Sequence, residues 1–436
     1  MTTALDRYRD ASQRRLRRAE RANHRLDIQG LRGIAVLAVL AYHLWGLPGA
    51  GFVGIDVFLV LAGFFAARTL LDSAAAEGPG FLRVFYAERA RRIIPAAALV
   101  LILTLAASEL LFSADRAESV GADTVFAFLF LANWHFADHA PAAAEASGAL
   151  SPLLHFWALS IEEQFLFVFP LIVLLITLVA MRARWSEQRF TGAAVVVVGL
   201  ATAASLGWAF YLADTSPAAA YYSTFARIWE LGAGALLAAA AAALTRLPDW
   251  IRPLLSWAGV GLVVASAFAL GGTDFPAPWA LLPVTGTLLV IAAGVGREPN
   301  FQPLLRNRAF TYVGDISYSL YLVHWPAIVL LAAVMNPTIY YDAATLALTF
   351  GLAIALHHFV DTPLRHARPR AIRQVRRDMR HGLFHVERAT KVAGVAALVL
   401  ITVSLIAYAA RPDAYHAAPQ QGCCAPAPAG PLPPQR

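Results

Sequence analysis

Charged side chains are scarce in this sequence. They make up 14% of its 436 residues, whereas hydrophobic residues make up 58%. An ordinary soluble domain carries about 25% charged residues, so the composition excludes a soluble protein of this length. Apolar runs of about twenty residues, enough to cross a bilayer, recur from the N-terminal third to the end of the chain. The sequence therefore predicts an all-α polytopic integral membrane bundle, with no room for a separate large soluble domain.

Cysteine and lysine are almost absent as well. Cys423 and Cys424 adjoin each other near the end of the chain, so they offer neither a disulfide framework nor the spacing of a metal site. Lys391 is the single lysine, and arginines carry nearly all the positive charge behind the net charge of +7. These arginines flank apolar runs, which is typical of cytoplasmic loops rather than of a nucleic-acid-binding surface. We therefore expect the protein to bind neither a metal ion nor nucleic acid.

The apolar runs and their flanking arginines predict about eleven crossings. The segment 124–134 is too short to cross, and a crossing there would invert the charge pattern of every later loop, so we expect it to be re-entrant or interfacial. The expected crossings are 31–48, 52–71, 93–112, 160–181, 192–212, 226–245, 254–271, 278–296, 312–334, 342–361 and 392–411.

This topology divides the chain into five parts. They are a basic cytoplasmic N-terminal arm (1–30), a membrane domain (31–365), a basic cytoplasmic linker (366–391), a further transmembrane helix (392–411) and a disordered, proline-rich extracytoplasmic tail (412–436). The arm leads into the first crossing without the small-residue cleavage site of a secretory signal, so we expect that crossing to stay in the membrane.

The first apolar run carries an ionisable side chain inside it. In RLDIQGLRGIAVLAVLAYHLW, Arg32 and His43 are separated by ten residues, so on a helix they lie about 16 Å apart along the axis and about twenty degrees apart around it. One helix face would then present a cation at the membrane edge and an imidazole near mid-depth. An ionisable group at that depth is costly and marks a candidate functional site, although a hydrogen-bonded structural histidine fits the same pattern.

Further charged groups lie near the next two crossings. Asp56, close to the start of the second crossing, is either a carboxylate at the interface or the partner of a nearby His or Arg. The segment FYAERARRIIPA places Arg89, Arg91 and Arg92 just before the third crossing. Such clusters usually mark only the cytoplasmic side, but guanidinium groups also bind phosphate through two parallel hydrogen bonds, which would suit a phosphorylated cytoplasmic ligand.

The densest set of polar residues lies in SPLLHFWALSIEEQFLFVFP. It contains His155, Ser160, Glu162 and Glu163 at the outer entrance of a crossing. Adjacent residues point about 100° apart on a helix, so both carboxylates cannot face lipid and at least one must face protein or a wet cavity. A carboxylate in that position can orient an imidazole or act as an acid or base, so this segment is a candidate site.

Two charge pairs are expected in the later crossings. In ARIWELGAGALLA, Arg227 and Glu230 lie within one turn, and the small residues beside them suit close helix packing. In DTPLR, Asp361 and Arg365 lie at the inner end of a crossing, where a pair at the helix terminus is the expected arrangement.

The segment GDISYSLYLVHWP places several polar groups in an otherwise apolar crossing. Ser319 and Tyr321 are most simply explained as hydroxyl groups that brace neighbouring helices. Ser317, Tyr318 and His324 are less easily explained in this way, so we keep them as site candidates.

Six segments together, in this order, resemble the acyltransferase-3 family of membrane acyltransferases, in particular its peptidoglycan and lipopolysaccharide O-acetylase branch. The likeness covers about residues 25–365 and is carried by RLDIQGLRGIAVLAVLAYHL, FVGIDVFLVLAGF, FYAERARRIIPA, LLHFWALSIEEQF, RIWELGAGALLA and SYSLYLVHWP. It implies transfer of an acyl group, commonly acetyl from cytoplasmic acetyl-CoA, to a carbohydrate hydroxyl at or beyond the outer face. The family's signature of an arginine, ten residues and a histidine falls on Arg32 and His43, and the basic residues that would meet the CoA phosphates fall on Arg89 and Arg92.

The sequence also departs from the family pattern. Glu88 stands where many members have the first arginine of an Arg-Arg-x-x-Arg motif. The last crossing resembles the helix that in related proteins leads to an extracytoplasmic SGNH hydrolase-like domain, but here only a short tail follows it. If acceptor transfer needs that domain, a separate SGNH-type extracytoplasmic protein is the expected partner; an inactive truncated homologue is the alternative.

The resemblance and the residues lead to one mechanistic hypothesis. Acyl-CoA would place its phosphates on the arginines named above, and its thioester would reach toward His43. The imidazole would act as a general base on the acceptor hydroxyl or be transiently acylated itself, with Glu162 or Glu163 setting its tautomer. The acceptor would be a carbohydrate or a glycolipid. A transporter or flippase with a buried His, Glu and Arg path is the alternative from another class, but it does not explain arginines placed for a cytoplasmic phosphate donor.

Overall fold

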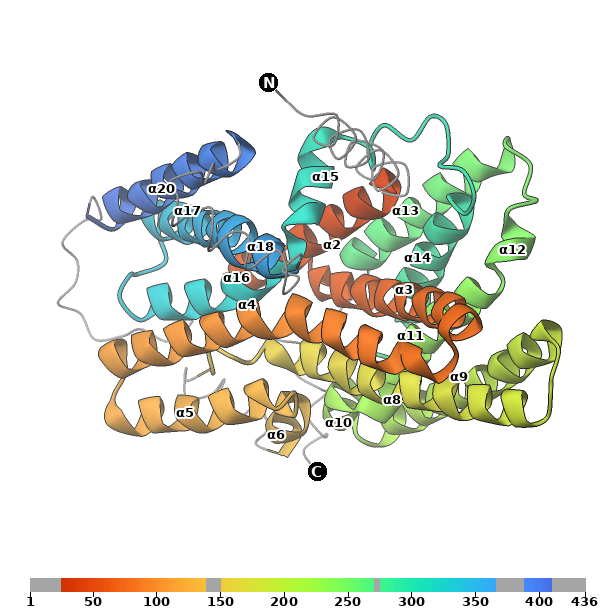
Figure 1. Ribbon diagram of the computed structural model, residues 1–436. Coiled ribbons are helices and arrows are strands. Elements are labelled where there is room, and N and C mark those ends of the chain that lie inside the picture. Colours follow the sequence, from red (N-terminus) through yellow and green to blue (C-terminus); the bar gives the residue numbers. More distant parts are fainter. Residues whose placement is uncertain (1–24, 139–149, 270–274, 366–387, 410–436) are drawn as a thin grey trace, which may run out of the picture.

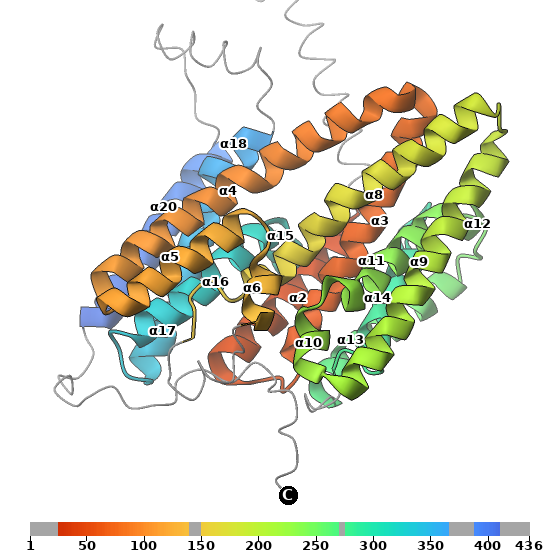
Figure 2. The same ribbon diagram turned by 90° about the horizontal axis from the view of Figure 1, so that it is seen from below.

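The computed structural model describes residues 25–138, 150–269, 275–365 and 388–409, and every regular element within these ranges is a helix. Figures 1 and 2 show the helices packed as one bundle, with α17 and α20 side by side at one edge. This confirms the predicted all-α polytopic membrane fold. The predictions for the arm up to residue 24, for 366–387 of the linker and for the tail fall outside the described residues.

The helices are joined mostly by short connections. In chain order they are α2 (Leu26–Trp45), η1 (Gly51–Val53), α3 (Gly54–Glu77), η2 (Gly78–Gly80), α4 (Phe81–Leu111), α5 (Ala114–Phe128), α6 (Ala132–Asp138), α8 (Phe156–Arg182), α9 (Glu187–Thr215), α10 (Pro217–Tyr222), α11 (Thr224–Ala239), α12 (Ala241–Leu244), α13 (Ile251–Ala269), α14 (Leu281–Ala293), α15 (Arg308–Asp315), α16 (Ser317–Ala332), α17 (Ile339–Leu356), the π-helical turn η3 (His357–Asp361), α18 (Thr362–Arg365) and α20 (Arg388–Ala409).

Each predicted crossing overlaps a helix or a helix pair. By length and apolar composition, the described residues contain eight helices that can cross a membrane, or up to nine if the bent pair of α15 and α16 is one span. This number is lower than the predicted eleven because of α11 and α14. They have 16 and 13 residues and are shorter than the spans predicted at those places. The segment 124–134 contains a turn at Phe130, where φ is 55°, between α5 and α6. Its place in a membrane stays a prediction.

The span predicted over 312–334 is not straight. α15 and α16 meet at an angle of 74°. The bend has a packing cause, because α15 and the loop before it lie directly on the first half of α2: a Cβ atom on Gly30 would collide with the carbonyl oxygen of Leu305, and one on Gly314 with that of Gln29. α16 begins a new direction at Ser317, and it still lies beside α2, because Ser317 contacts Arg32 and His324 contacts His43.

α3 and α11 pack closely through glycines. A Cβ atom on Gly234 would collide with the carbonyl oxygen of Val60, and one on Gly63 with that of Leu231. Small residues allow two backbones to approach in this way, which drives helix association where lipid is as apolar as the side chains. The small residues of ARIWELGAGALLA therefore have the packing role that the sequence predicted.

We expect Gly234→Ala to destabilise the protein. The added methyl group has to push α3 and α11 apart, and overpacking of this kind costs about 1–3 kcal/mol. Gly207→Ala on α9 is the matched control, because a Cβ atom there would meet nothing within 4 Å. Thermal unfolding in detergent should show a midpoint several degrees lower for Gly234→Ala alone, and equal midpoints would contradict the close approach.

Candidate active site

A cavity of about 700 Å³ lies inside the bundle, between α2, α3, α4, α8, α16 and α18. Most of its lining side chains are apolar and come from α3, α4 and α8. The polar and charged lining residues are Arg32, Thr69, Glu88, Arg89, Arg91, Arg92, Glu162, Ser317, Tyr318, Tyr321 and Arg365. All the arginines that the sequence predicted as donor-binding residues therefore meet in one place.

The arginines of FYAERARRIIPA reach the cavity because they lie on a helix rather than in a loop. α4 begins at Phe81 and continues without interruption to Leu111, so these residues form its early turns. Arg89 and Arg92 are three positions apart and share a face of the helix. Both side chains line the cavity.

Arg89 is held by the two glutamates of α8. Its Nη2 lies 2.6 Å from Oε1 of Glu162 and 2.5 Å from Oε1 of Glu163, and its Nε lies 3.2 Å from Oε2 of Glu163. The carboxylates thus face α4 and neutralise one guanidinium group. Neither of them contacts His43, so the expected role of Glu162 or Glu163 in setting the tautomer of that imidazole has no support in the contacts of the described residues.

Arg32, Arg92 and Arg365 also line the cavity, and none of them forms an ion pair with a residue that the structure describes. Arg32 donates to the hydroxyl of Ser317 at 2.8 Å, and it has no carboxylate of the described residues within ion-pair distance. Arg92 and Arg365 likewise form no ion pair with any residue that the structure describes. Positive charge without a counter-charge in a part-buried cavity favours an anionic ligand, and guanidinium groups suit phosphate.

Arg365 is a cavity residue that the sequence analysis missed. The expected ion pair between Asp361 and Arg365 is absent from the described residues: an Asp361 carboxylate oxygen lies 3.3 Å from Nδ1 of His357 instead. Asp361 and His357 both belong to the π-helical turn η3, which directs the carboxylate of Asp361 toward His357. The sequence did place Arg365 at the inner end of a crossing, where it could meet a cytoplasmic ligand. The neighbouring Asp361 suggested a local ion pair instead.

His43 lies in the last turn of α2, because α2 starts and ends earlier than the predicted span. Its depth in the membrane stays a prediction. The left-handed Gly46, with φ of 69°, ends the helix. The imidazole rings of His43 and His324 are nearly parallel, at 18°, with centres 5.2 Å apart, and Nδ1 of His43 lies 3.1 Å from Nε2 of His324. The ring centre of Trp325 lies 4.8 Å from that of His43. The structure thus brings together two predicted site residues from opposite ends of the chain.

His155 completes a group of three histidines. Its ring is buried, with its centre 5.5 Å from that of His324, and its Nε2 lies 3.1 Å from the carbonyl oxygen of Leu322. That carbonyl is available because Pro326, four residues later in α16, has no N–H to donate to it. His155 Nδ1 has no hydrogen-bond partner in the described part of the chain. Within the same residues, no group of three or more His, Cys, Asp or Glu side chains is arranged to hold a metal ion.

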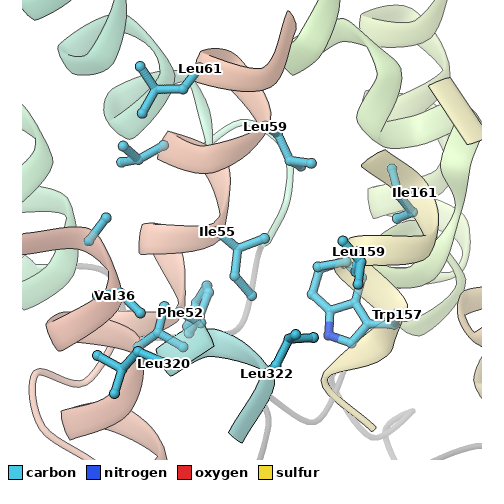
Figure 3. Packing of buried hydrophobic residues seen from close by; sticks show 14 of the residues in the cluster. Val36, Phe52, Ile55, Leu59, Leu61, Trp157, Leu159, Ile161, Leu320 and Leu322 are labelled. Atoms are coloured by element: carbon cyan, nitrogen blue, oxygen red, sulfur yellow. The ribbon is translucent and has the colours of Figure 1, made fainter. Parts of the chain in front are cut away.

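His43 and His155 border a second, small hollow of about 20 Å³. Its lining includes His43, His155 and the aromatic side chains Tyr42, Trp157, Tyr221, Tyr222 and Trp325. Ile55 and Tyr321 line both this hollow and the large cavity, so these two side chains divide them. Figure 3 shows Ile55 on α3 pointing toward α8, from which Trp157 points back. A path from the arginines to His43 has to pass this divider.

Two other candidates act as braces. The Ser160 hydroxyl donates to the carbonyl of Phe156 at 2.9 Å and accepts from the N–H of Ala132, which ties α8 to α6. The Tyr318 hydroxyl donates to the carbonyl of Ile93 at 2.8 Å and ties α16 to α4. Both groups are satisfied by the fold.

Asp56 belongs to a buried charge cluster outside both cavities. Nη1 of Arg227 lies 2.8 Å from Oδ1 of Asp56 and 2.7 Å from Oε1 of Glu230. This confirms the predicted pair of Arg227 and Glu230 and makes Asp56 the partner of an arginine. The rings of Phe275 and Tyr221 lie 4.9 and 5.3 Å from the guanidinium carbon. The cluster holds α3 to α11.

Several known proteins are similar to this chain. YrhL of Bacillus subtilis, assigned as a peptidoglycan O-acetyltransferase, is 30% identical over 78% of this chain and 54% of its own length. The peptidoglycan O-acetyltransferase OatA of Listeria monocytogenes is 29% identical over 78% of this chain and 55% of its own. BcsY of Komagataeibacter xylinus, assigned as a membrane-bound transacylase, is 30% identical over 70% of this chain and 74% of its own.

The chain thus matches about half the length of the first two of these relatives. No solved structure matches it significantly. Residues 25–358 match the family described as an acyltransferase domain, which covers nearly all of the membrane bundle described above. The chain therefore belongs to the acyltransferase-3 family.

Proposed function

We propose that this protein is a membrane O-acetyltransferase that moves an acetyl group from cytoplasmic acetyl-CoA to a hydroxyl of a cell-envelope carbohydrate or glycolipid. The names of the relatives support the reaction class. The observation that carries the proposal is a cavity with unpaired arginines beside a hollow that contains the histidine of the family signature. The predicted topology puts the N-terminus in the cytoplasm and the C-terminal tail outside.

The large cavity suits a donor with a charged head and an apolar arm. Its volume of about 700 Å³ lies within the usual range for small-molecule sites. Arg32, Arg92 and Arg365 are proposed to bind the phosphates of acyl-CoA, because they are the cavity arginines without a carboxylate partner in the described chain. Arg89, locked to Glu162 and Glu163 across α4 and α8, is proposed to shape the wall beside them.

His43 is proposed to be the reacting base. In the direct route, a ring nitrogen of His43 takes the proton of the acceptor hydroxyl while the oxygen attacks the thioester carbonyl; the carbon–sulfur bond breaks, and the thiolate leaves with that proton. In the two-step route, the ring nitrogen attacks the thioester and becomes acylated, the thiolate leaves, and the acceptor oxygen then displaces the imidazole. A separate extracytoplasmic SGNH-type protein is the proposed partner for delivery to the acceptor.

The direct test of the proposed function is a comparison of surface glycans. Mass spectrometry of cell-wall and other surface glycans from a deletion strain should show a loss of acetyl groups that the intact gene restores. An unchanged glycan profile, together with no binding of acetyl-CoA to the purified protein, would remove the proposal and leave the family membership alone.

We expect His43→Ala to abolish acetyl transfer. Removal of a general base or of a nucleophile costs about a hundredfold or more in rate. The arginine cavity does not include His43, so binding of CoA should persist in the variant. The measurement is transfer activity alongside calorimetric CoA binding and elution of the purified protein as a folded species. Full activity of this variant would eliminate His43 as the reacting group.

We expect Arg92→Gln and Arg365→Gln each to weaken donor binding. Loss of one charged hydrogen bond to phosphate costs about 1.5–3 kcal/mol, so the Kd for acetyl-CoA should rise about tenfold to a hundredfold. Arg83→Gln is the matched control, because Arg83 lies on α4 with an exposed side chain and outside the cavity lining. Titration of the purified protein with acetyl-CoA measures the three values. Equal Kd values in all three variants would place the phosphates elsewhere.

A further inference from the structure

One ring nitrogen of His324 is within hydrogen-bond distance of a backbone carbonyl group, and the other is within hydrogen-bond distance of His43. Its Nδ1 lies 2.7 Å from the carbonyl oxygen of Tyr321, one turn earlier in α16. A carbonyl oxygen has no proton to give, so this contact requires that Nδ1 of His324 carries the hydrogen. A neutral imidazole carries one hydrogen, and Nε2 of His324 is therefore a bare acceptor.

That acceptor determines the tautomer of His43. Nε2 of His324 lies 3.1 Å from Nδ1 of His43. Two bare nitrogens at this separation would repel, so Nδ1 of His43 must carry a hydrogen and donate it. The lone pair of His43 is then on Nε2, for which the described residues provide no hydrogen-bond partner.

The surroundings keep both rings neutral. His324 is 1% exposed, and no carboxylate of the described residues lies within ion-pair distance of either ring. A buried cation without a counter-charge is costly, and two imidazolium rings with centres 5.2 Å apart would also repel each other. A charged His324 would reverse the hydrogen bond and put the hydrogen of His43 on Nε2, so the neutrality of His324 decides which atom is reactive.

We propose that His324 is the positioning residue that fixes the hydrogen of His43 on Nδ1 and leaves Nε2 as the atom that takes a proton or attacks the thioester. This inference rests on the proposed function, in which His43 is the reacting group. It moves the tautomer-setting role from Glu162 and Glu163, which contact Arg89, to a histidine of α16. His324 lines neither the large cavity nor the small hollow, so it would act through His43.

Two variants of the full-length protein test the assignment. His324→Gln keeps an oxygen acceptor at the end of the side chain, whereas His324→Leu removes any acceptor. NMR of the ring nitrogens in isotopically labelled histidine, with the His43 signals assigned by their loss in His43→Gln, reports the tautomer directly. We expect the hydrogen on Nδ1 of His43 in the natural protein and in His324→Gln, and on Nε2 for a large part of the population in His324→Leu.

Kinetics provide the second readout. His324→Leu should lower kcat about a hundredfold with little change in the KM for acetyl-CoA, because the arginine cavity is untouched, and His324→Gln should retain at least about ten times the kcat of His324→Leu. A His43 hydrogen on Nε2 in the natural protein would overturn the inference even if the enzyme is active, and so would equal losses in both variants. A hydrogen on Nδ1 without any acetyl transfer would instead contradict the proposed function and leave the tautomer assignment standing. If His324→Leu fails to fold, the natural protein and His324→Gln still decide the tautomer.

Discussion

Positive charge that no carboxylate balances is expensive inside an apolar bundle, and the arrangement of the site depends on two partly buried charges of this kind, Arg32 and Arg92, and on the exposed Arg365 beside them. The buried arginines have partners: Arg227 lies between two carboxylates, and Arg252 donates to several backbone carbonyl groups. Arg32, Arg92 and Arg365 face one cavity and lack such a carboxylate in the described chain. A fold that satisfies its structural arginines and leaves these three available is suited to an anionic ligand.

The structure keeps this charge apart from the imidazole. Ile55 and Tyr321 border both hollows, and the Tyr321 hydroxyl is fixed on the carbonyl of His155. A cavity with free guanidinium groups attracts water, and water competes with any acceptor for an activated acyl group. Expelling water from the reacting groups limits such side reactions, so in the proposed reaction a divider between the arginines and His43 would favour transfer over hydrolysis.

The sequence predicted the helical class and the small-residue contact of α11 from composition and helical spacing. The gathering of Arg32, Arg89 and Arg92 was expected from the family resemblance. The sequence did not predict the partner of His43. His43 and His324 are far apart in the chain, and their contact depends on the bend before α16, which arises from the packing of α15 on α2. Arg365 was missed for a related reason: helical spacing suggested a local partner that the π-helical turn directs elsewhere.

α16 touches both ends of the site, with Ser317 beside Arg32 and His324 beside His43. The two helices therefore fix the distance between the arginine end and the histidine end of the site. Along the helix axis, about 10 Å separates Ser317 from His324 on α16, and about 16 Å separates Arg32 from His43 on α2. An acyl phosphate, whose carbonyl adjoins the phosphorus through one oxygen, is too short to bridge this gap while its phosphate stays on the arginines. A thioester carried at the end of a long flexible arm can span it, so under the proposed function this spacing favours such a donor by its length.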